Sequence, residues 1–325
     1  MKQSLFESRH KAEWEQFALL LDRLERGKEA SRVARFPQDY RRLCHHLALA
    51  RERGYSSFLV DSLQHQVLRG HQQFYRHRSQ LGDQALQFIL ADFPRRVRQQ
   101  WRFVLASGLM FFGSLIGVGL LVYLFPDLIY TLIPAPQVND LQSMYDPVAG
   151  HLGRTADRAA SEDWVMFGYY ILHNIGIAFQ TFASGFLFGL GSVFFLLFNG
   201  LSIGAIAGHL TQIGYGQTFW SFVIGHGAFE LSAITLSGAA GLQLGWALVA
   251  PGRLPRGEAL RLAARDSVAL ICGVMLFLLL AAFIEAYWSS MTTTSPLTKY
   301  LVGAGLWLLV AAYLLLAGRS RHAPE

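Results

Sequence analysis

The chain has 325 residues, of which 52% are hydrophobic and only 15% are charged, and its formal net charge is +6. Residues 1–102 contain 19 of the 28 basic residues and 11 of the 22 acids, a local net charge of +8, so the remainder is nearly neutral and poor in charge. A water-soluble domain needs a far more polar surface, so the composition excludes a single soluble protein and predicts a water-facing part followed by a lipid-facing part.

Three helices are predicted in the water-facing part, residues 1–84. In residues 11–25, Trp14, Phe17 and Leu21 recur at helical spacing, with charged residues between them. A second helix begins near Pro37, because proline suits the first turn of a helix, and a third runs from about residue 57 to residue 77. We expect a small cytoplasmic helical domain.

Residues 85–102 combine apolar residues with basic ones, which is typical of an amphipathic helix on a membrane surface. Each cation near anionic lipid contributes on the order of 1 kcal/mol. The predicted lipid-surface residues are Arg95, Arg96, Arg98 and Arg102. We therefore expect an interfacial elbow helix that contacts membrane lipids.

About six membrane-spanning helices follow, since a span needs roughly 20 apolar residues. The predicted spans are 103–125, 165–182, 184–208, 219–249, 268–288 and 297–317, with an external loop at 126–163 and a tail at 319–325. The segment 165–182 contains His173, Asn174 and Gln180, so it is either a span or an interfacial or re-entrant segment. The predicted fold class is thus an all-α, polytopic membrane bundle.

The charges that flank the spans predict the orientation of the chain. Loop 126–163 contains two arginines and six acids, whereas residues 250–266 contain four arginines, and Arg319 and Arg321 lie in the tail. Basic flanks stay in the cytoplasm. We therefore expect a multi-pass protein of the cytoplasmic (inner) membrane with both termini in the cytoplasm.

Glycines recur at four-residue spacing in the predicted spans. Small residues at this spacing let two helices approach closely in lipid, either within one chain or between copies in an oligomer. The predicted helix-packing glycines are Gly185, Gly189, Gly200, Gly204, Gly208, Gly241 and Gly245, and Gly113 and Gly117 repeat the pattern.

Glu230 and Glu285 are the only acids well inside the apolar segments. A charge at the centre of a span costs roughly 2.5–3.5 kcal/mol, so each needs a partner or a function. His226 lies one turn before Glu230 on the same helix face. We predict a polar pocket in the outer half of the bundle, with Asn199 nearer the midplane, from His173, Asn174, Asn199, His209, His226, Glu230 and Glu285. The histidine and carboxylate are either a structural pair or a site for a ligand, partner or ion.

No catalytic motif is complete. A metalloprotease of the H-E-x-x-H type needs two histidines one turn apart, whereas residues 226–230 read H-G-x-x-E and offer two ligands without a third. The Walker motif is also absent from the sequence, and the string G-x-S-x-G occurs once, at residues 200–204, inside a predicted span and not at the strand-to-helix turn where this motif acts. We expect no catalytic residue, no bound metal, no cofactor and no enzymatic activity. Nucleic acid is not an expected partner, because the basic cluster adjoins the first span and no recognition motif occurs.

The sequence resembles the stage II sporulation protein M family of integral membrane proteins. The resemblance covers most of residues 85–290 and rests on Asn199-Gly200 with its glycine ladder, His226-Gly227-x-x-Glu230-Leu231, Phe283-Ile284-Glu285 and Phe93-Pro94. It implies a membrane scaffold, because the sporulation member assembles peptidoglycan-degrading proteins during engulfment. The N-terminal helical domain and the last span are additions that suggest a broader branch of the family.

Three functions are compatible with these features. The first is a non-enzymatic scaffold, related to the cell envelope, that forms homo-oligomers and recruits protein partners through residues 1–84 and loop 126–163. The alternative is a channel or transporter that uses the pocket around His226, Glu230 and Glu285, although no inverted repeat is evident. An intramembrane metal-dependent hydrolase ranks third.

Overall fold

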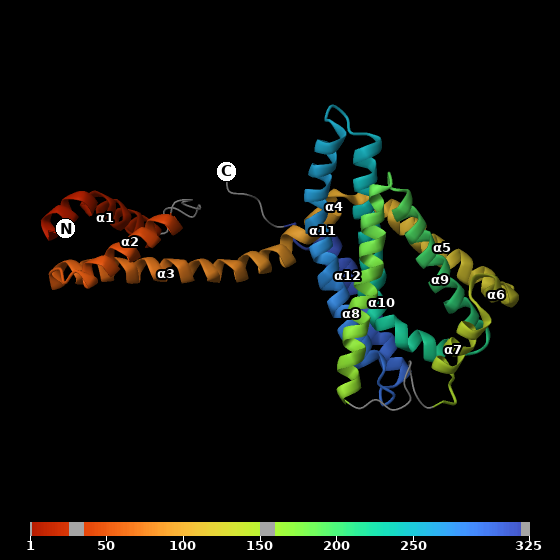
Figure 1. Cartoon of the computed structure of the whole chain (residues 1–325). Coiled ribbons are helices and arrows are strands. Elements are labelled where there is room, and N and C mark those ends of the chain that lie inside the picture. Colours follow the sequence, from red (N-terminus) through yellow and green to blue (C-terminus); the bar gives the residue numbers. More distant parts are fainter. Residues whose placement is uncertain (1, 26–35, 150–159, 320–325) are drawn as a thin grey trace. The chain divides into compact units, whose positions relative to one another are not determined.

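The computed structural model describes residues 2–25, 36–149 and 160–319, and within these ranges all regular structure is helical (Figure 1). The chain divides into two compact units, Met1–Gln87 and Phe88–Glu325. The predicted all-α membrane bundle is thereby confirmed as the fold class. Parts of two predicted segments, residues 150–159 of the external loop and 320–325 of the tail, lie outside the described residues.

The first unit contains α1 (Gln3–Glu25), α2 (Phe36–Glu52) and α3 (Ser57–Gln87). Its core is built from aromatic and leucine side chains of all three helices, including Phe6, Trp14, Phe17, Leu43 and Leu63. The helix α1 begins well before residue 11, because Phe6 is 1% exposed and packs against Trp14.

The elbow differs from the predicted surface helix. It consists of a π-helical turn, η1 (Phe88–Asp92), and a short helix, α4 (Phe93–Gln99), and the chain breaks at Gln100 before the first span. Phe93 is 2% exposed and packs against Phe277 of the bundle. The apolar face of α4 therefore contacts protein, because Gly273 leaves room for the Phe93 ring.

Three of the four predicted lipid-surface arginines also contact protein groups. Arg98 donates hydrogen bonds to the carbonyl oxygens of Leu314 and Ala317 at 2.8 and 2.7 Å. Arg95 donates to the carbonyl oxygen of Gly318, and Arg96 lies 3.8 Å from a carboxylate oxygen of Asp266. Arg102 remains exposed beside Trp101. The arginines of α4 thus contact the ends of neighbouring helices, while their partly exposed side chains leave contact with membrane lipids as a prediction.

The second unit is the membrane bundle. Its long helices are α5 (Trp101–Leu124), α8 (Ala160–Ala183), α9 (Leu190–Gln212), α10 (Gly216–Val249), α11 (Arg256–Ile284) and α12 (Pro296–Leu316). Short segments connect them: η2 (Pro126–Leu128), α6 (Ile129–Leu132), α7 (Ala135–Tyr145), η3 (Ser184–Phe186) and the π-helical η4 (Glu285–Ser289). Within the described residues, five helices are long and apolar enough to cross a membrane: α5, α9, α10, α11 with η4, and α12.

The helix α8 is the more polar segment whose crossing the sequence left open. It is continuous over 24 residues, which corresponds to about 36 Å. Its Trp164 ring lies near Tyr287 after α11, and Gly185, just after its end, packs against Gly241 near the end of α10. The helix α8 therefore lies along the bundle beside α10 and is not a re-entrant loop (Figure 1).

Glycines join the helices at two seams. A Cβ atom at Gly204 would collide with the carbonyl oxygen of Leu115 in α5, and one at Gly208 with that of Gly119. At the second seam Gly185 meets Gly241, and Gly245 meets the backbone of residues 188–189. The turn there needs left-handed backbone, since φ is 54° at Phe188 and 84° at Gly189. All seven predicted packing glycines thus face neighbours within the chain; Gly200 packs against Ser114 and Phe111.

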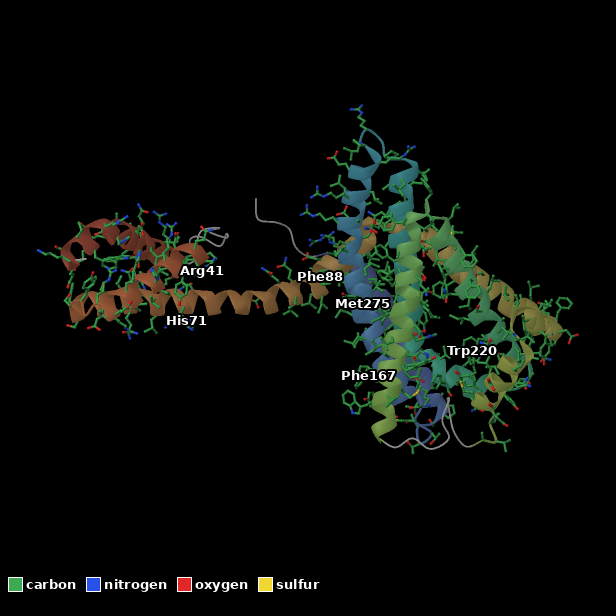
Figure 2. All side chains as sticks on the ribbon, viewed as in Figure 1. Arg41, His71, Phe88, Phe167, Trp220 and Met275 are labelled. Atoms are coloured by element: carbon green, nitrogen blue, oxygen red, sulfur yellow. The ribbon has the colours of Figure 1, made fainter. Side chains whose placement is uncertain are left out.

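The two ends of the bundle carry opposite charges. The arginines of α4 lie beside the end of α12 and the start of α11, and those of residues 253–265 lie in the α10–α11 turn and the first turns of α11 (Figure 2). At the other end, Thr218 of α10 donates a hydrogen bond to the carbonyl oxygen of Tyr145 in α7. The described acids of that end are Asp127, Asp140, Asp146 and Asp163. One end of the bundle is therefore basic and the other is mainly acidic.

Candidate functional site

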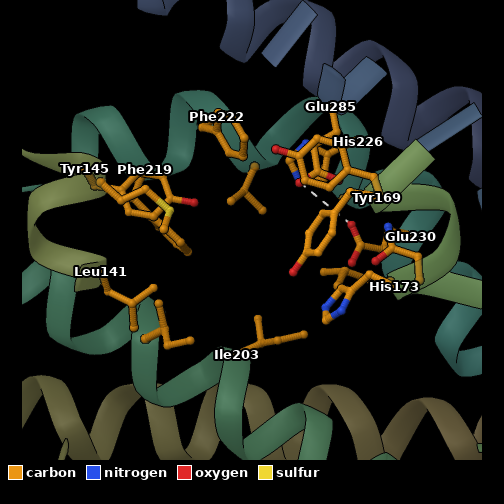
Figure 3. Close-up of a pocket in the computed structure, with 17 residues that line it drawn as sticks. Leu141, Tyr145, Tyr169, His173, Ile203, Phe219, Phe222, His226, Glu230 and Glu285 are labelled. Atoms are coloured by element: carbon orange, nitrogen blue, oxygen red, sulfur yellow. Dashed lines mark ion pairs between the residues drawn. The ribbon is translucent and has the colours of Figure 1, made fainter. Parts of the chain in front are cut away.

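A cavity of about 250 Å³ lies in the acidic half of the bundle, between α7, α8, α9, α10 and η4 (Figure 3). Its apolar wall includes Leu141, Tyr145, Ile203, Phe219 and Phe222. Its polar wall includes Tyr169, His173, Asn174, His226, Glu230 and Glu285. A small number of convergent polar groups in an apolar cavity is typical of a binding site.

His226 and Glu230 of α10 face the same side of the cavity because they are one turn apart. His226 is 4% exposed. Its Nε2 lies 3.8 Å from Oε2 of Glu230, and its Nδ1 lies 2.9 Å from the hydroxyl oxygen of Ser289. The ring is therefore held on both sides, by a carboxylate and by a hydroxyl group.

Glu285 joins this pair from a different helix. It is the first residue of the π-helical turn η4, and Ser289 is the last. π-Helical turns are rare and are frequently found at functional sites. One potential ligand atom from each of His226, Glu230 and Glu285 lies within 4.8 Å of the other two. Two glutamates far apart in sequence thus meet at one imidazole ring.

The helix α8 supplies the opposite wall. The rings of Tyr169 and His173 stack with centroids 5.7 Å apart and an interplanar angle of 9°. Asn174 is 3% exposed, and its Nδ2 atom has no hydrogen-bond partner. A buried amide group without a partner is costly, so this position favours a ligand or an ordered water molecule.

Two residues of the predicted pocket lie outside the cavity wall. The side chain of Asn199 donates a 2.7 Å hydrogen bond to the carbonyl oxygen of Phe195 in its own helix. His209 is buried at the end of α9, where its Nε2 lies 2.9 Å from Nε2 of Gln142 in α7. The structure brings the other five together: His173, Asn174, His226, Glu230 and Glu285.

Sequence reasoning missed two contributors to this region. The helix α7 covers the cavity with Leu141, Met144 and Tyr145, and prolines at Pro134 and Pro136 followed by this apolar spacing could have indicated it. Lys299 is 1% exposed in α12 and donates a 2.8 Å hydrogen bond to the carbonyl oxygen of Ser289. Its position in an apolar segment was a usable signal.

Comparisons with known proteins agree with this architecture. The sequence model of the family described as Stage II sporulation protein M matches residues 106–290, and that of a domain of unknown function (DUF8413) matches residues 4–76. The chain is 26% identical over 137 residues to Uncharacterized protein MJ0793 of Methanocaldococcus jannaschii, across 41% of this chain and 75% of that protein. No solved structure matches the chain.

The first match spans α5 to η4 and therefore includes the cavity and all three residues around the imidazole ring. It covers more than half of the 325 residues. The chain belongs to the stage II sporulation protein M family.

Proposed function

We propose that this member of the stage II sporulation protein M family is a non-enzymatic scaffold of the cytoplasmic membrane, with both termini in the cytoplasm. The main support is that the chain divides into two units. One is a polar helical unit with its own core, and the other is a membrane bundle whose helices pack closely against one another at glycines. Such a bundle anchors a folded domain at the membrane surface, where the domain recruits a partner protein. The basic end of the bundle supports the orientation, since basic flanks stay in the cytoplasm.

The test is gentle purification of the full chain from native membranes, followed by identification of the proteins that copurify in fixed ratio. A variant that lacks residues 2–87 should lose the cytoplasmic partner and still insert in the membrane. If the variant keeps every partner of the full chain, recruitment by the first unit is wrong. A second variant, in which α7 is replaced by a flexible linker, tests recruitment by the external segment in the same way.

Homo-oligomer formation is part of the proposal, and the exposed face of α5 supports it best. Gly113 and Gly117 lie one turn apart on this helix, are exposed, and have nothing within 4 Å of an added Cβ atom. Lipid-exposed glycines at this spacing let a second helix approach. Replacing both with isoleucine should dissociate the oligomer, whereas Gly305→Ile on α12, an equally open position, should not.

Transport is the second candidate function, and the cavity with its ionisable wall favours it. Against it, the bundle between the cavity and the basic end is closed by a packed core that includes Ala233, Ala240, Leu270 and Leu278. Transport therefore needs rearrangement of α10 against α11. Flux into liposomes that is lost in Glu230→Gln would support this function over the scaffold.

A further inference from the structure

We propose that His226, Glu230 and Glu285 bind one divalent transition-metal cation of the Zn²⁺ class at the wall of the cavity. This site is independent of the scaffold proposal, since it concerns the bundle alone. Glu285 provides the third ligand, which the sequence of residues 226–230 does not contain. The proposal replaces the expectation from the sequence that the chain binds no metal.

The distances fit a metal centre that closes slightly on binding. Zinc bonds to nitrogen and oxygen ligands are about 2.0–2.2 Å long, so ligand atoms around a tetrahedral ion are about 3.4 Å apart. The separation of His226 Nε2 and Glu230 Oε2 is 3.8 Å, and all three potential ligand atoms lie within 4.8 Å of one another. Binding would require the two carboxylates to rotate until this remaining gap is closed.

The hydrogen bond to Ser289 prepares the imidazole ring for a metal. When Nδ1 donates its proton to the Ser289 hydroxyl oxygen, Nε2 carries a lone pair that faces the carboxylates. Metal-binding histidines typically donate their second ring N–H to such a partner, which fixes the tautomer and the ring orientation. Lys299 in turn donates to the carbonyl oxygen of Ser289 and stabilises this turn.

Charge also favours a divalent cation. Two carboxylates in an apolar bundle need compensation. Basic residues are scarce here: residues 103–252 contain only Arg154 and Arg158, and Lys299 is the only basic residue between Arg265 and Arg319. One divalent ion neutralises both carboxylates at once. Imidazole with carboxylates suits zinc, iron or manganese better than calcium.

Asn174 is an independent observation that points to a ligand in the same cavity. Its side chain lines the cavity, is 3% exposed, and its Nδ2 has no hydrogen-bond partner. A water molecule or small anion bound to the metal would accept this N–H. The three protein ligands leave at least one coordination position open for such a group.

The experiment measures metal in the full chain, purified in detergent without chelators. We expect about one zinc ion per chain by inductively coupled plasma mass spectrometry. After stripping with a chelator, titration with Zn²⁺ should restore one site, Mn²⁺ should bind more weakly, and Ca²⁺ most weakly. Co²⁺ should give the visible absorption of a low-coordinate nitrogen and oxygen site, which reports ligation directly.

Glu285→Gln should lower Zn²⁺ affinity at least a hundredfold, and Ser289→Ala about tenfold, as expected for a group that positions a ligand. Glu258→Gln, at the start of the same helix, is the matched control. His10→Ala tests the other cluster of potential ligands, His10, Glu13 and His46 in the first unit. Both controls should retain full binding, and circular dichroism must give native helicity for every variant.

The proposal is overturned if the stripped wild-type chain binds no Zn²⁺. It is equally overturned if a folded Glu285→Gln variant binds Zn²⁺ as tightly as the wild type, or if His10→Ala abolishes binding.

Discussion

The helical unit and the membrane bundle both place a histidine near another histidine or a carboxylate, but they use its ring differently. In the first unit the indole N–H of Trp14 donates to Nδ1 of His46 at 3.1 Å, so the neutral ring carries its proton on Nε2. In the bundle Nδ1 of His226 faces a hydroxyl group, and Nε2 faces a carboxylate. Similar residue types thus make a structural contact in one unit and a candidate metal site in the other.

The two units also pack by different means. The first unit buries large side chains such as Phe6, Trp14 and Phe17 in its core. Removal of their apolar surface from water favours folding. The bundle brings backbones together at Gly204 and Gly241, because lipid provides no such driving force between helices. In the first unit, the loss of stability should therefore increase with the side-chain volume that a substitution removes. In the bundle, it should increase with the volume that a substitution adds at a glycine.

The largest effect is expected for Trp14→Ala. This side chain is 8% exposed, packs against Phe6, and donates to His46. Its removal should lower the free energy of unfolding of the first unit by about 3–5 kcal/mol. Circular dichroism of residues 1–87 in urea measures this loss. Phe58→Ala, at a position that is 84% exposed, should change stability by less than about 0.5 kcal/mol. Equal losses in both variants would contradict the assigned core.

Metal removal should separate the two units most clearly. At free Zn²⁺ one hundred times the dissociation constant, a site in the folded state alone contributes about 2.7 kcal/mol. Adding a chelator should therefore lower the thermal midpoint of the bundle and leave that of residues 1–87 unchanged. The check is differential scanning fluorimetry of the full chain and of Glu285→Gln. A chelator effect of the same size in that variant would exclude these ligands as its cause.

Sequence alone predicted the long helices of both units but not α7, because amphipathic spacing and long apolar runs are local signals. The encounter of Glu285 with His226 and Glu230 was predicted only as a general pocket, since it depends on how α11 ends in the turn η4. The contact between Arg98 and the end of α12 joins residues more than 200 positions apart, and a basic amphipathic pattern suits a lipid surface equally well. In both cases the sequence does not show which helices lie next to each other in the folded chain.

The glycine seam predicts a smaller loss. In Gly204→Ala the new methyl group meets the carbonyl oxygen of Leu115, so α5 and α9 must separate. We expect a loss of about 1–3 kcal/mol, as is typical of overpacking. Gly305→Ala lies on the open face of α12 and should be neutral or slightly stabilising, because alanine favours a helix. The measurement is the unfolding midpoint of each variant in mixed detergent and denaturant. A neutral Gly204→Ala would contradict the close approach of these two helices.

The smallest effect is a pH dependence that belongs to the first unit. The pKa of His46 lies below its ordinary value of 6.5, chiefly because of burial and then because of His10, with smaller opposing or reinforcing effects from Glu13, His45 and Arg42. The unfolded chain therefore binds a proton at a higher pH than the folded chain does. Stability is complete above pH 6.5 and falls as the pH decreases below it, with a limiting slope of about 1.4 kcal/mol per pH unit for one proton.

We expect stability to fall between pH 6.5 and 5, with a slope no steeper than about 1.4 kcal/mol per pH unit, measured by urea unfolding of residues 1–87. His46→Gln should remove most of this loss, because its amide oxygen still accepts the Trp14 N–H but does not titrate. His65→Gln, at an exposed position, should keep it. The pKa of Glu25 is lowered from 4.5, chiefly by its hydrogen bond to Arg69. The stabilising effect of Glu25 is therefore lost only below about pH 4.5, outside the pH interval from 6.5 to 5 in which His46 is tested. An unchanged pH profile in His46→Gln would show that another group titrates. The difference between His46 and His226 would then be supported only by their hydrogen-bond geometry.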